Sequence, residues 1–193
     1  DKAELTKAKE ALSELTTAAD PTTGKTADSA KTYTDKKTAA EEAIKEAEAV
    51  INDENATPEK VTEALNKVNE KKEALEAAKQ ALVEAATAEE KAKLKADAAQ
   101  LTKANETGKT PDSIAAYEAA YEKLKSQLEE AKEAAAAVEA KGDNATKAKA
   151  QEAQAKVEAA KTALDKAAEL LVNKADKAEL TKAKEALSEL TTA

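Results

Sequence analysis

Carboxylate pairs are the first groups in this sequence that could do chemistry. Glu129 and Glu133, for example, lie one helical turn apart, a spacing that could support paired acid–base catalysis. Such catalysis needs two pKa values held apart by the surroundings, and a strongly charged helix leaves both carboxylates in water. The chain also lacks His, Cys, a glycine-rich phosphate loop and a Ser placed beside a base. We therefore expect no enzyme, no catalytic residue and no cofactor.

Two acidic turns contain oxygen atoms that could bind calcium. One consists of Asp53, Glu54 and Asn55, and the other of Asp143 and Asn144. Neither turn has the alternating ligand spacing or the distant bidentate Glu of a helix–loop–helix calcium site. We expect solvated turns and no metal site.

Three Asn-x-Thr sequences, which begin at Asn55, Asn105 and Asn144, could accept N-linked glycans in a suitable secretory host. A structural role is the interpretation that we favour. Asn tolerates the left-handed conformation at the end of a helix, and the Thr two residues later can cap the next helix.

The aromatic residues of the chain are Tyr33, Tyr117 and Tyr121. Exposed aromatic side chains could bind a sugar or a protein ligand. All three, however, lie on or near an apolar stripe, close to the start of a predicted helix. We expect them to pack between helices with their hydroxyl groups at the edge of the core.

Apolar residues at steps of three and four predict three helices in each of two homologous units. The longest stripe consists of Ile114, Tyr117, Tyr121, Leu124, Leu128, Ala131, Ala135 and Val138. Its counterpart in the first unit is weaker and consists of Tyr33, Ala40, Ile44, Ala47 and Ile51. The first helices carry Leu5, Ala8, Leu12 and Leu15, and Leu94, Ala98 and Leu101; the third carry Val61, Val68, Leu75 and Leu82, and Ala150, Val157, Leu164 and Leu171.

Glycine and proline fall between these stripes, at Pro21, Gly24, Pro58, Gly108, Pro111 and Gly142. Thr57 and Thr110 each precede a proline, the arrangement of an N-cap followed by proline at the first helical position. Thr26 can cap the corresponding helix of the first unit. The helices of one unit therefore begin and end at defined residues.

The junction between the units allows two interpretations. Neither Gly nor Pro occurs in two long stretches, 59–106 and 143–193, so the last helix of one unit could continue into the next for about 70 Å. Against continuity, Thr87 with Glu90 has the spacing of a capping box, and Asn173 with Asp176 repeats it. A continuous helix and a break near Thr87 both remain open.

Repeats on two length scales organise the chain. The eighteen residues 1–18 recur unchanged as 176–193, a period of 175 residues that also preserves surface positions and therefore indicates recent duplication. Inside this period, GKTADSAKTY at 24–33 matches GKTPDSIAAY at 108–117, and the NAT at 55–57 matches the NAT at 144–146. We predict three domains: a first three-helix unit at 1–86, a second at 87–172, and the first helix of a third unit at 173–193.

Composition excludes several classes of function. Charged residues make up 36% of the chain, the net charge is −8, and every basic residue is Lys, which disfavours nucleic-acid binding. No apolar run is long enough for membrane insertion, and the absence of a start Met and of a signal peptide suggests an excerpt of a longer chain. Zero Cys suits a secreted protein of a Gram-positive bacterium.

The stretch GKTADSAKTYTDKKTAAEEAIKEAEAVINDENATPEKVTEALNKVNEKKEALEAAKQALV resembles a FIVAR module. The resemblance lies in the early Tyr, the alanine-rich stripe, the NAT turn and the closing Ala-Leu run, all repeated in the second unit. FIVAR repeats occur in cell-wall-anchored surface proteins of Gram-positive bacteria, including extracellular-matrix-binding adhesins. The resemblance implies an adhesin stalk and, for some members, fibronectin or sugar binding. No ligand-binding residue can be carried across.

We expect an all-α fold of tandem three-helix bundles that share or abut long helices in a spectrin-like elongated rod. The expected function is that of a structural stalk, or spacer, on the bacterial cell surface, which projects a distal binding domain from the cell wall. The alternative is a module whose repeats bind fibronectin or a glycan. The expected partners are neighbouring repeats of the same chain, and we expect a monomer because the Gly and Pro positions favour intramolecular bundles over a dimeric coiled coil.

Overall fold

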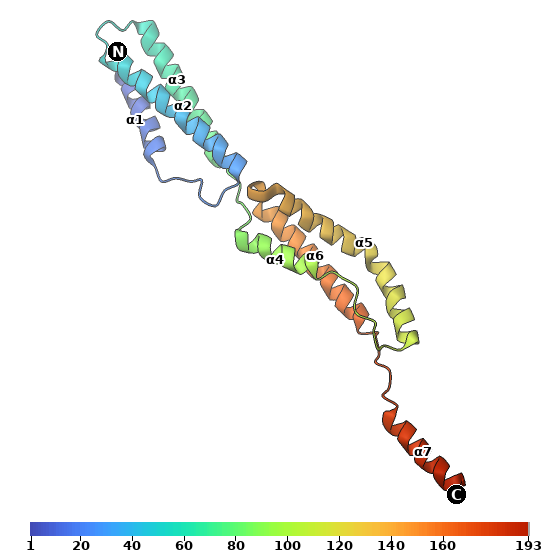
Figure 1. The fold of residues 1–193 in the computed structure, drawn as a ribbon. Helices are drawn as coiled ribbons and strands as arrows, with labels where there is room; N and C mark the ends of the chain where they lie inside the picture. The colour runs from blue at the N-terminus through green and yellow to red at the C-terminus, as the bar shows by residue number, and fades with distance from the viewer. Residues whose placement is uncertain (193) are drawn as a thin grey trace. The chain divides into compact units, whose positions relative to one another are not determined.

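The computed structural model describes residues 1–192, and its regular structure is helical throughout (Figure 1). The prediction of an all-α fold is confirmed. The elements are α1 (Ala3–Thr17), α2 (Ala27–Asn52), α3 (Pro58–Gln80), α4 (Ala88–Ala99), α5 (Pro111–Lys141), the 3-10 helix η1 (Gly142–Asn144), α6 (Lys147–Ala168) and α7 (Ala178–Thr192). None of the helices described is both long and apolar enough to cross a lipid bilayer.

The chain divides into two compact units that do not coincide with the sequence repeats. The first unit combines Asp1–Lys93 with Ala136–Glu152, and the second combines Leu94–Ala135 with the chain from Ala153 onward. The turn between α5 and α6 thus belongs to the first unit, although it lies in the second sequence repeat.

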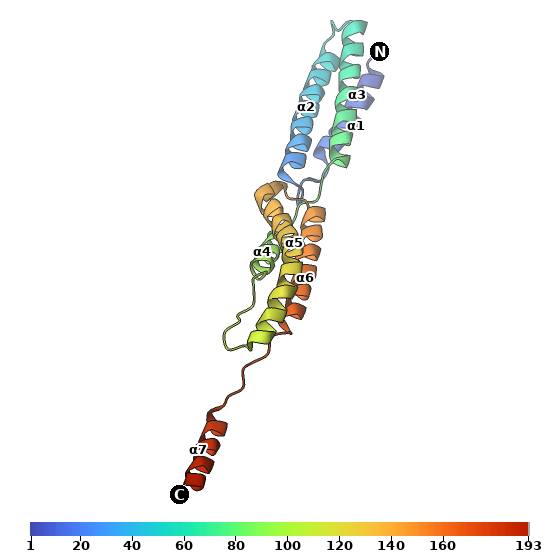
Figure 2. The same ribbon diagram turned by 90° about the vertical axis from the view of Figure 1, so that its right-hand side faces the viewer.

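In the first unit, α1, α2 and α3 pack against one another as a three-helix bundle (Figures 1 and 2). Each of the three predicted stripes contributes to its core, so their assignment to the buried face is confirmed. The buried members are Leu5, Leu12, Tyr33, Ala40, Ala43, Ala47, Val68, Leu75 and Ala78. Partly buried residues that include Leu15, Ile44, Val61 and Leu82 border this core.

Alanine makes the inner face of α2 unusually thin. Ala40, Ala43 and Ala47 are each at most 1% exposed, so neighbouring helices can approach this face closely. An alanine buries little apolar area, so bulky side chains from the other helices must supply most of the hydrophobic stabilisation. Leu5 and Leu12 of α1, both 0% exposed, are two of the largest fully buried side chains.

The second unit buries the equivalent stripes of α4, α5 and α6. Its buried apolar side chains are Leu94, Leu101, Tyr117, Leu128, Ala131, Ala135, Ala153, Val157, Ala160, Leu164 and Ala167. The buried Leu101 lies two residues beyond the end of α4, so the apolar stripe that begins at Leu94 extends past the end of the helix. Gln154 Nε2 donates a hydrogen bond to Asp97 Oδ2 over 2.7 Å and joins α6 to α4.

The helix is broken near Thr87 at the junction between the repeats, so the predicted capping box is confirmed and a continuous helix is not. Helix α3 ends at Gln80, and α4 begins only at Ala88. The Glu90 N–H donates to Thr87 Oγ1 over 3.0 Å, and the Thr87 N–H donates to Glu90 Oε1 over 3.1 Å. These reciprocal bonds satisfy amide groups that a continuous helix would have bonded internally.

The second break is also present, but its predicted cap is wrong. Helix α7 begins at Ala178, whose N–H donates to Asp176 Oδ1 over 3.0 Å. Asn173 is not the N-cap, because it lies too far upstream, and its Oδ1 instead accepts a hydrogen bond from Lys109 Nζ over 2.7 Å.

Helices α1 and α7 have the same sequence and opposite surroundings. Leu5 and Leu12 are fully buried in the first bundle, whereas their counterparts Leu180 and Leu187 are 69% and 62% exposed. Both helices contain 15 residues. The sequence therefore provides its own control for the contribution of bundle packing.

Replacing each of the paired leucines with alanine should separate packing from helix formation. We expect Leu12→Ala to lower the free energy of unfolding of its bundle by about 2–4 kcal/mol, because it leaves a cavity between α2 and α3. The matched Leu187→Ala should change stability by less than about 0.5 kcal/mol. Urea denaturation followed by circular dichroism at low micromolar concentration measures both values, and equal effects would contradict the packing described here.

Candidate functional site

The recurrent GKTxDS sequence forms the most clearly repeated polar arrangement of the two units. Its copies are Gly24–Ser29 and Gly108–Ser113. Each copy precedes the second helix of a repeat and pairs with the segment that leaves the third helix, at Val83–Ala85 or Val172–Lys174. We call each pair of segments a GKTxDS clasp. The first clasp lies in the first unit, and the second clasp lies in the second unit.

Two backbone hydrogen bonds close each clasp. In the first, the Thr26 N–H donates to the Val83 carbonyl over 2.8 Å, and the Ala85 N–H donates to the Gly24 carbonyl over 2.9 Å. The second clasp has the same bonds at the same lengths, from Thr110 to Val172 over 2.8 Å and from Lys174 to Gly108 over 2.9 Å. The two repeats thus fix the chain after their third helix in the same way.

The Thr and Ser of the motif make the clasp continuous with the helix that follows. The Ser29 N–H donates to Thr26 Oγ1 over 3.4 Å as an N-cap of α2, and the Val83 N–H donates to Ser29 Oγ over 3.2 Å. The same bonds measure 3.3 Å from Ser113 N–H to Thr110 Oγ1 and 3.0 Å from Val172 N–H to Ser113 Oγ. The Thr caps were predicted, but the role of Ser was missed, although the recurrence of the motif was a visible signal for it.

Glycine opens the motif because the backbone turns there through a left-handed conformation. Gly24 has φ 74° and Gly108 has φ 76°, and a Cβ at either position would meet no atom within 4 Å. The constraint is therefore conformational and not steric, since residues with a Cβ rarely adopt such a φ.

A third segment, the turn between α5 and α6, completes the first clasp. The Ala86 N–H donates to the Ala145 carbonyl over 2.9 Å, and the Lys147 N–H donates to the Glu84 carbonyl over 2.9 Å. The chain from Glu84 to Ala86 is consequently bonded on both sides, as a central strand would be.

Charge at this turn favours the same arrangement. Lys147 Nζ lies 2.6 Å from Glu90 Oε1. The hydrogen bond from Lys147, with further bonds to Thr87, lowers the pKa of the Glu90 carboxyl. Any stability from this pair is present above the ordinary pKa of Glu and is lost as the pH falls through the lowered value.

The asparagines of the Asn-x-Thr sequences have structural roles that differ from the predicted ones. The predicted left-handed conformation of the asparagines is wrong, because among residues 1–192 a positive φ occurs only at glycine. Gly142 takes that conformation before Asn144, whose Oδ1 instead accepts from the Asp28 N–H over 2.8 Å at the start of α2. Asn105 Oδ1 accepts from the Thr107 N–H over 3.0 Å.

The Thr of these sequences caps a helix in two of the three cases. Thr57 accepts from the Lys60 N–H over 3.2 Å, and Thr146 accepts from the Lys149 N–H over 3.1 Å. Thr107 does not cap, because α5 begins later and Thr110 has that role.

The acidic residues considered for calcium or catalysis are dispersed. Asp53 Oδ1 accepts from the Asn55 N–H over 2.9 Å, while the Asp143 side chain is 93% exposed. Glu129 and Glu133 both face solvent. Within residues 1–192 no three Asp, Glu, His or Cys side chains gather as a metal site would require.

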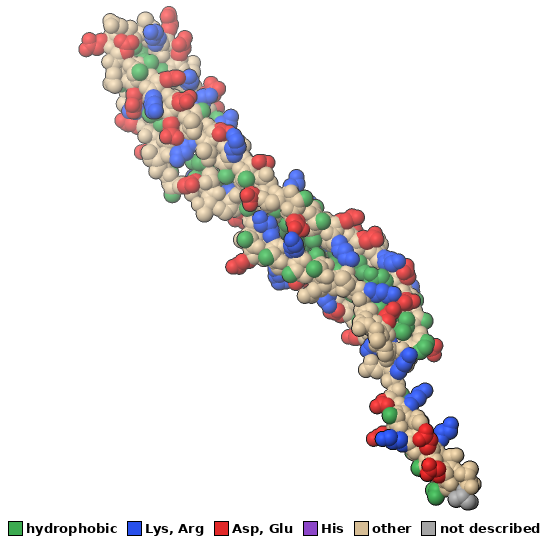
Figure 3. Space-filling view, in the orientation of Figure 1, with side chains coloured by type: hydrophobic (Ala, Val, Ile, Leu, Met, Phe, Trp, Pro, Cys, Tyr) green, Lys and Arg blue, Asp and Glu red, His purple; other side chains and the backbone are tan. Residues whose placement is uncertain are grey.

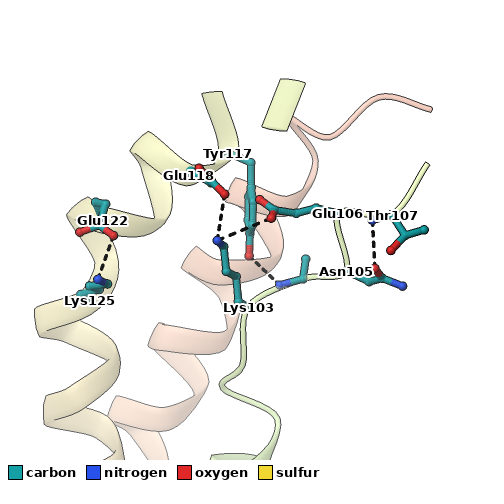
Figure 4. A network of polar contacts seen from close by, with 9 residues as sticks. Lys103, Asn105, Glu106, Thr107, Tyr117, Glu118, Glu122 and Lys125 are labelled. Carbon is teal, nitrogen blue, oxygen red and sulfur yellow. Dashed lines mark hydrogen bonds and ion pairs between the residues drawn. The ribbon is translucent and has the colours of Figure 1, made fainter. Parts of the chain in front are cut away.

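The tyrosines pack as predicted at two of their three positions. Tyr33 is 5% exposed and Tyr117 is 0% exposed, while Tyr121 is half-buried. The Tyr117 hydroxyl accepts a hydrogen bond from the Ala104 N–H over 2.7 Å (Figure 4). Tyr117 thereby attaches the segment after α4 to α5.

Lys103 reinforces this attachment from outside the core (Figure 4). Its Nζ lies 3.1 Å from Glu118 Oε1, 3.6 Å from Glu106 Oε1 and 5.8 Å from the centre of the Tyr121 ring. The hydrogen bond between Lys103 and Glu118 raises the pKa of the lysine and lowers the pKa of the glutamate. The cluster is a pair of ion contacts that joins the loop after α4 to α5.

Tyr117→Phe should test the attachment of this loop. We expect the free energy of unfolding to fall by about 1–2 kcal/mol, because the partly buried Ala104 N–H loses its acceptor while the ring still fills the core. Tyr121→Phe, at the half-buried neighbouring position, is the matched control and should cost less than about 0.5 kcal/mol. Amide hydrogen exchange should show faster exchange at Ala104 in the first variant only, and unchanged protection there would refute the role of the hydroxyl.

Comparison with known proteins gives two findings. The chain is similar to a solved chain from a study of the adherence of Staphylococcus epidermidis to fibronectin mediated by extracellular matrix binding protein (Embp). The identity is 26%, 86% of this chain and 98% of the other are covered, and the TM-score is 0.32. The family model described as the FIVAR domain matches residues 8–76 and 79–165. These two matches span most of the sequence and both three-helix repeats, and the chain therefore belongs to the FIVAR family.

Proposed function

We propose that this chain is a spacer repeat of a bacterial cell-surface adhesin, which projects a distal binding domain from the cell wall. Its repeat units are residues 1–86 and 87–172, and residues 173–193 are the first helix of a third unit. The protein acts outside the cell and without catalysis. Membership of the FIVAR family supports the adhesin context, because FIVAR repeats occur in surface proteins of Gram-positive bacteria.

The recurrent clasp is the observation that carries this proposal. Both copies use two backbone hydrogen bonds of equal length to hold the segment after the third helix. Backbone bonds depend little on the identity of the side chains, so the same joint can recur while surface residues change. A spacer requires a reproducible joint in every repeat, whereas a ligand site requires particular side chains in one place.

The surface chemistry agrees with a passive role. Lys and acidic side chains alternate over the face shown in Figure 3, without a large region of one sign. Exposed ion pairs such as Lys67 with Glu46 and Lys125 with Glu122 contribute little each, so single substitutions are tolerated. A hollow of about 390 Å³ in the second unit has only one apolar side chain, Val157, in its lining. Such a lining offers little to a buried ligand.

The alternative is that the repeats themselves bind a host-matrix protein such as fibronectin, or a glycan. The feature that favours it is the exposure of Val83 and Val172, 41% and 56%, one valine in each clasp. Exposed valines at equivalent positions of both repeats could contact one extended partner at regular intervals.

Two measurements on the full chain separate these functions. For a spacer, we expect no saturable binding to immobilised fibronectin or to a glycan array at concentrations up to about 100 μM, a weak-affinity limit. Val83→Ser with Val172→Ser is the control that should abolish any binding through the exposed valines. Saturable binding at low micromolar concentration that this variant loses would replace the spacer by the alternative.

The second measurement tests the spacer function directly through the length of the protein. Chains extended by one, two and three 175-residue periods should gain the same increment in maximum dimension per period in small-angle X-ray scattering. A dimension that grows only with the cube root of the mass would contradict a spacer, because the repeats would then collapse into one globule.

A further inference from the structure

The chain leaves the first three-helix bundle through a segment that is hydrogen-bonded on both sides. We call residues 83–86 the exit segment, because they join the end of α3 to the start of α4. We propose that the backbone bonds of this segment form a tension-bearing lock, which keeps the first bundle folded when the chain is pulled lengthwise. The purpose of the lock rests on the proposed spacer function, since a spacer between a cell and a bound ligand carries tension.

Tension applied to the chain runs along α2 in the first bundle. Lys2 Nζ donates to the carbonyls of Ile51 and Asp53 over 2.9 and 2.8 Å, so the start of α1 lies beside the C-terminal end of α2 (Figure 1). The exit segment lies at the N-terminal end of α2, where it pairs with residues 24–26. The chain therefore enters and leaves the bundle at opposite ends of its longest helix, which contains 26 residues. A pull on the chain loads the exit segment along its own length.

Antiparallel pairing gives the exit segment its resistance to such a pull. Lys25 pairs with Glu84, and Ala85 pairs with Thr146, both in antiparallel orientation. Hydrogen bonds between antiparallel segments lie perpendicular to the chain, so a lengthwise pull shears them together and does not open them one at a time. Bonds on one side reach residues 24–26, and bonds on the other side reach the turn between α5 and α6. The load on the exit segment is therefore shared between two neighbouring segments.

Both neighbours of the exit segment are anchored to α2. Residues 24–26 continue directly into this helix, because Thr26 is its N-cap. The turn between α5 and α6 is attached to the same end of the helix through Asn144, whose Oδ1 accepts a hydrogen bond from the Asp28 N–H over 2.8 Å. The load therefore passes into α2, whose buried alanine face packs against α1 and α3.

Lys147 contributes to the lock in two separable ways. Its N–H donates to the Glu84 carbonyl over 2.9 Å, and its Nζ lies 2.6 Å from Glu90 Oε1. Lys147→Pro removes both contacts, because proline has no N–H, whereas Lys147→Ala removes only the ion pair. A comparison of these two variants therefore isolates the backbone bond to the exit segment.

Proline is compatible with position 147, because the first repeat already has one at the equivalent place. Pro58 is the counterpart of Lys147, and each follows the threonine of an NAT sequence. Thr57 and Thr146 cap their helices in the same way, with bonds of 3.2 and 3.1 Å from the N–H three residues later. Proline is favoured at the first position of a helix, where the N–H has no intrahelical acceptor. Lys147→Pro should therefore leave the bundle folded, which circular dichroism checks.

Optical-tweezer measurements on the full chain at constant force test the lock. The native chain has no Cys, so Glu4→Cys with Glu89→Cys attaches handles whose load passes through the exit segment. Glu4→Cys with Lys79→Cys places the second handle before that segment. In the first geometry, Lys147→Pro should shorten the lifetime of the folded bundle about 5-fold relative to Lys147→Ala, as expected for one lost backbone bond. In the second geometry, the lifetimes of the two variants should agree within about 2-fold.

The two pulling geometries distinguish a lock from general stabilisation of the fold. Equal lifetimes of Lys147→Pro and Lys147→Ala in the first geometry would overturn the proposal. A similar shortening in both geometries would also overturn it, because the bond would then stabilise the bundle without bearing the load. Neither outcome bears on the spacer function, which the scattering and binding measurements test separately.

Asn144→Ala is a second variant that leaves Lys147 unchanged. It detaches the turn between α5 and α6 from Asp28, so we expect a lifetime at least about 2-fold shorter in the first geometry only. Asn55→Ala is the matched control, because Asn55 is the exposed counterpart of Asn144 in the turn between α2 and α3, at the other end of α2. It should keep the native lifetime in both geometries. An unchanged lifetime of Asn144→Ala in the first geometry would refute the anchoring of the turn to α2.

Discussion

The insertion of the α1 leucines between α2 and α3 is the interaction on which the first bundle depends. Alanines give α2 a thin inner face, which permits close approach but buries little area. Leu5 and Leu12 compensate from the shortest helix of the bundle. Much of the buried bulky area thus comes from a helix whose sequence occurs twice in the chain.

The clasps determine where the third helix of each repeat ends. A third helix rich in Ala, Glu and Lys has no intrinsic reason to stop, since these residues are strong helix formers. Hydrogen bonds from Thr26 and to Gly24 hold the chain at Val83–Ala85 in an extended form, and the Thr87–Glu90 capping box then starts the next helix. Termination here results from long-range pairing that outweighs the local helical preference.

This division explains what the sequence could predict. Stripes and caps are local, so the buried leucines and the caps at Thr26, Thr57 and Thr110 were correctly assigned. The continuity of the junction could not be decided, because the bonds that break it come from residues about 60 positions away in either direction. The conformation of the asparagines was predicted wrongly for a related reason, since the partner of Asn144 is also distant in the sequence. Gly142 supplies the left-handed turn, and Asn144 is then free to cap α2.

Identical repeats limit how selectively the α2–α3 groove can bind its first helix. A groove cannot distinguish α1 from α7 by contact, because the two sequences are the same, so only the tether sets its choice. The tether favours the local helix, because it gives that helix a high effective concentration at the groove. The first clasp joins segments of its own repeat and so holds the ends of α2 and α3 together beside α1. Identity between repeats and a local joint are therefore linked features: identical helices give a groove no side-chain basis for selection, and the joint within each repeat supplies the selection through proximity.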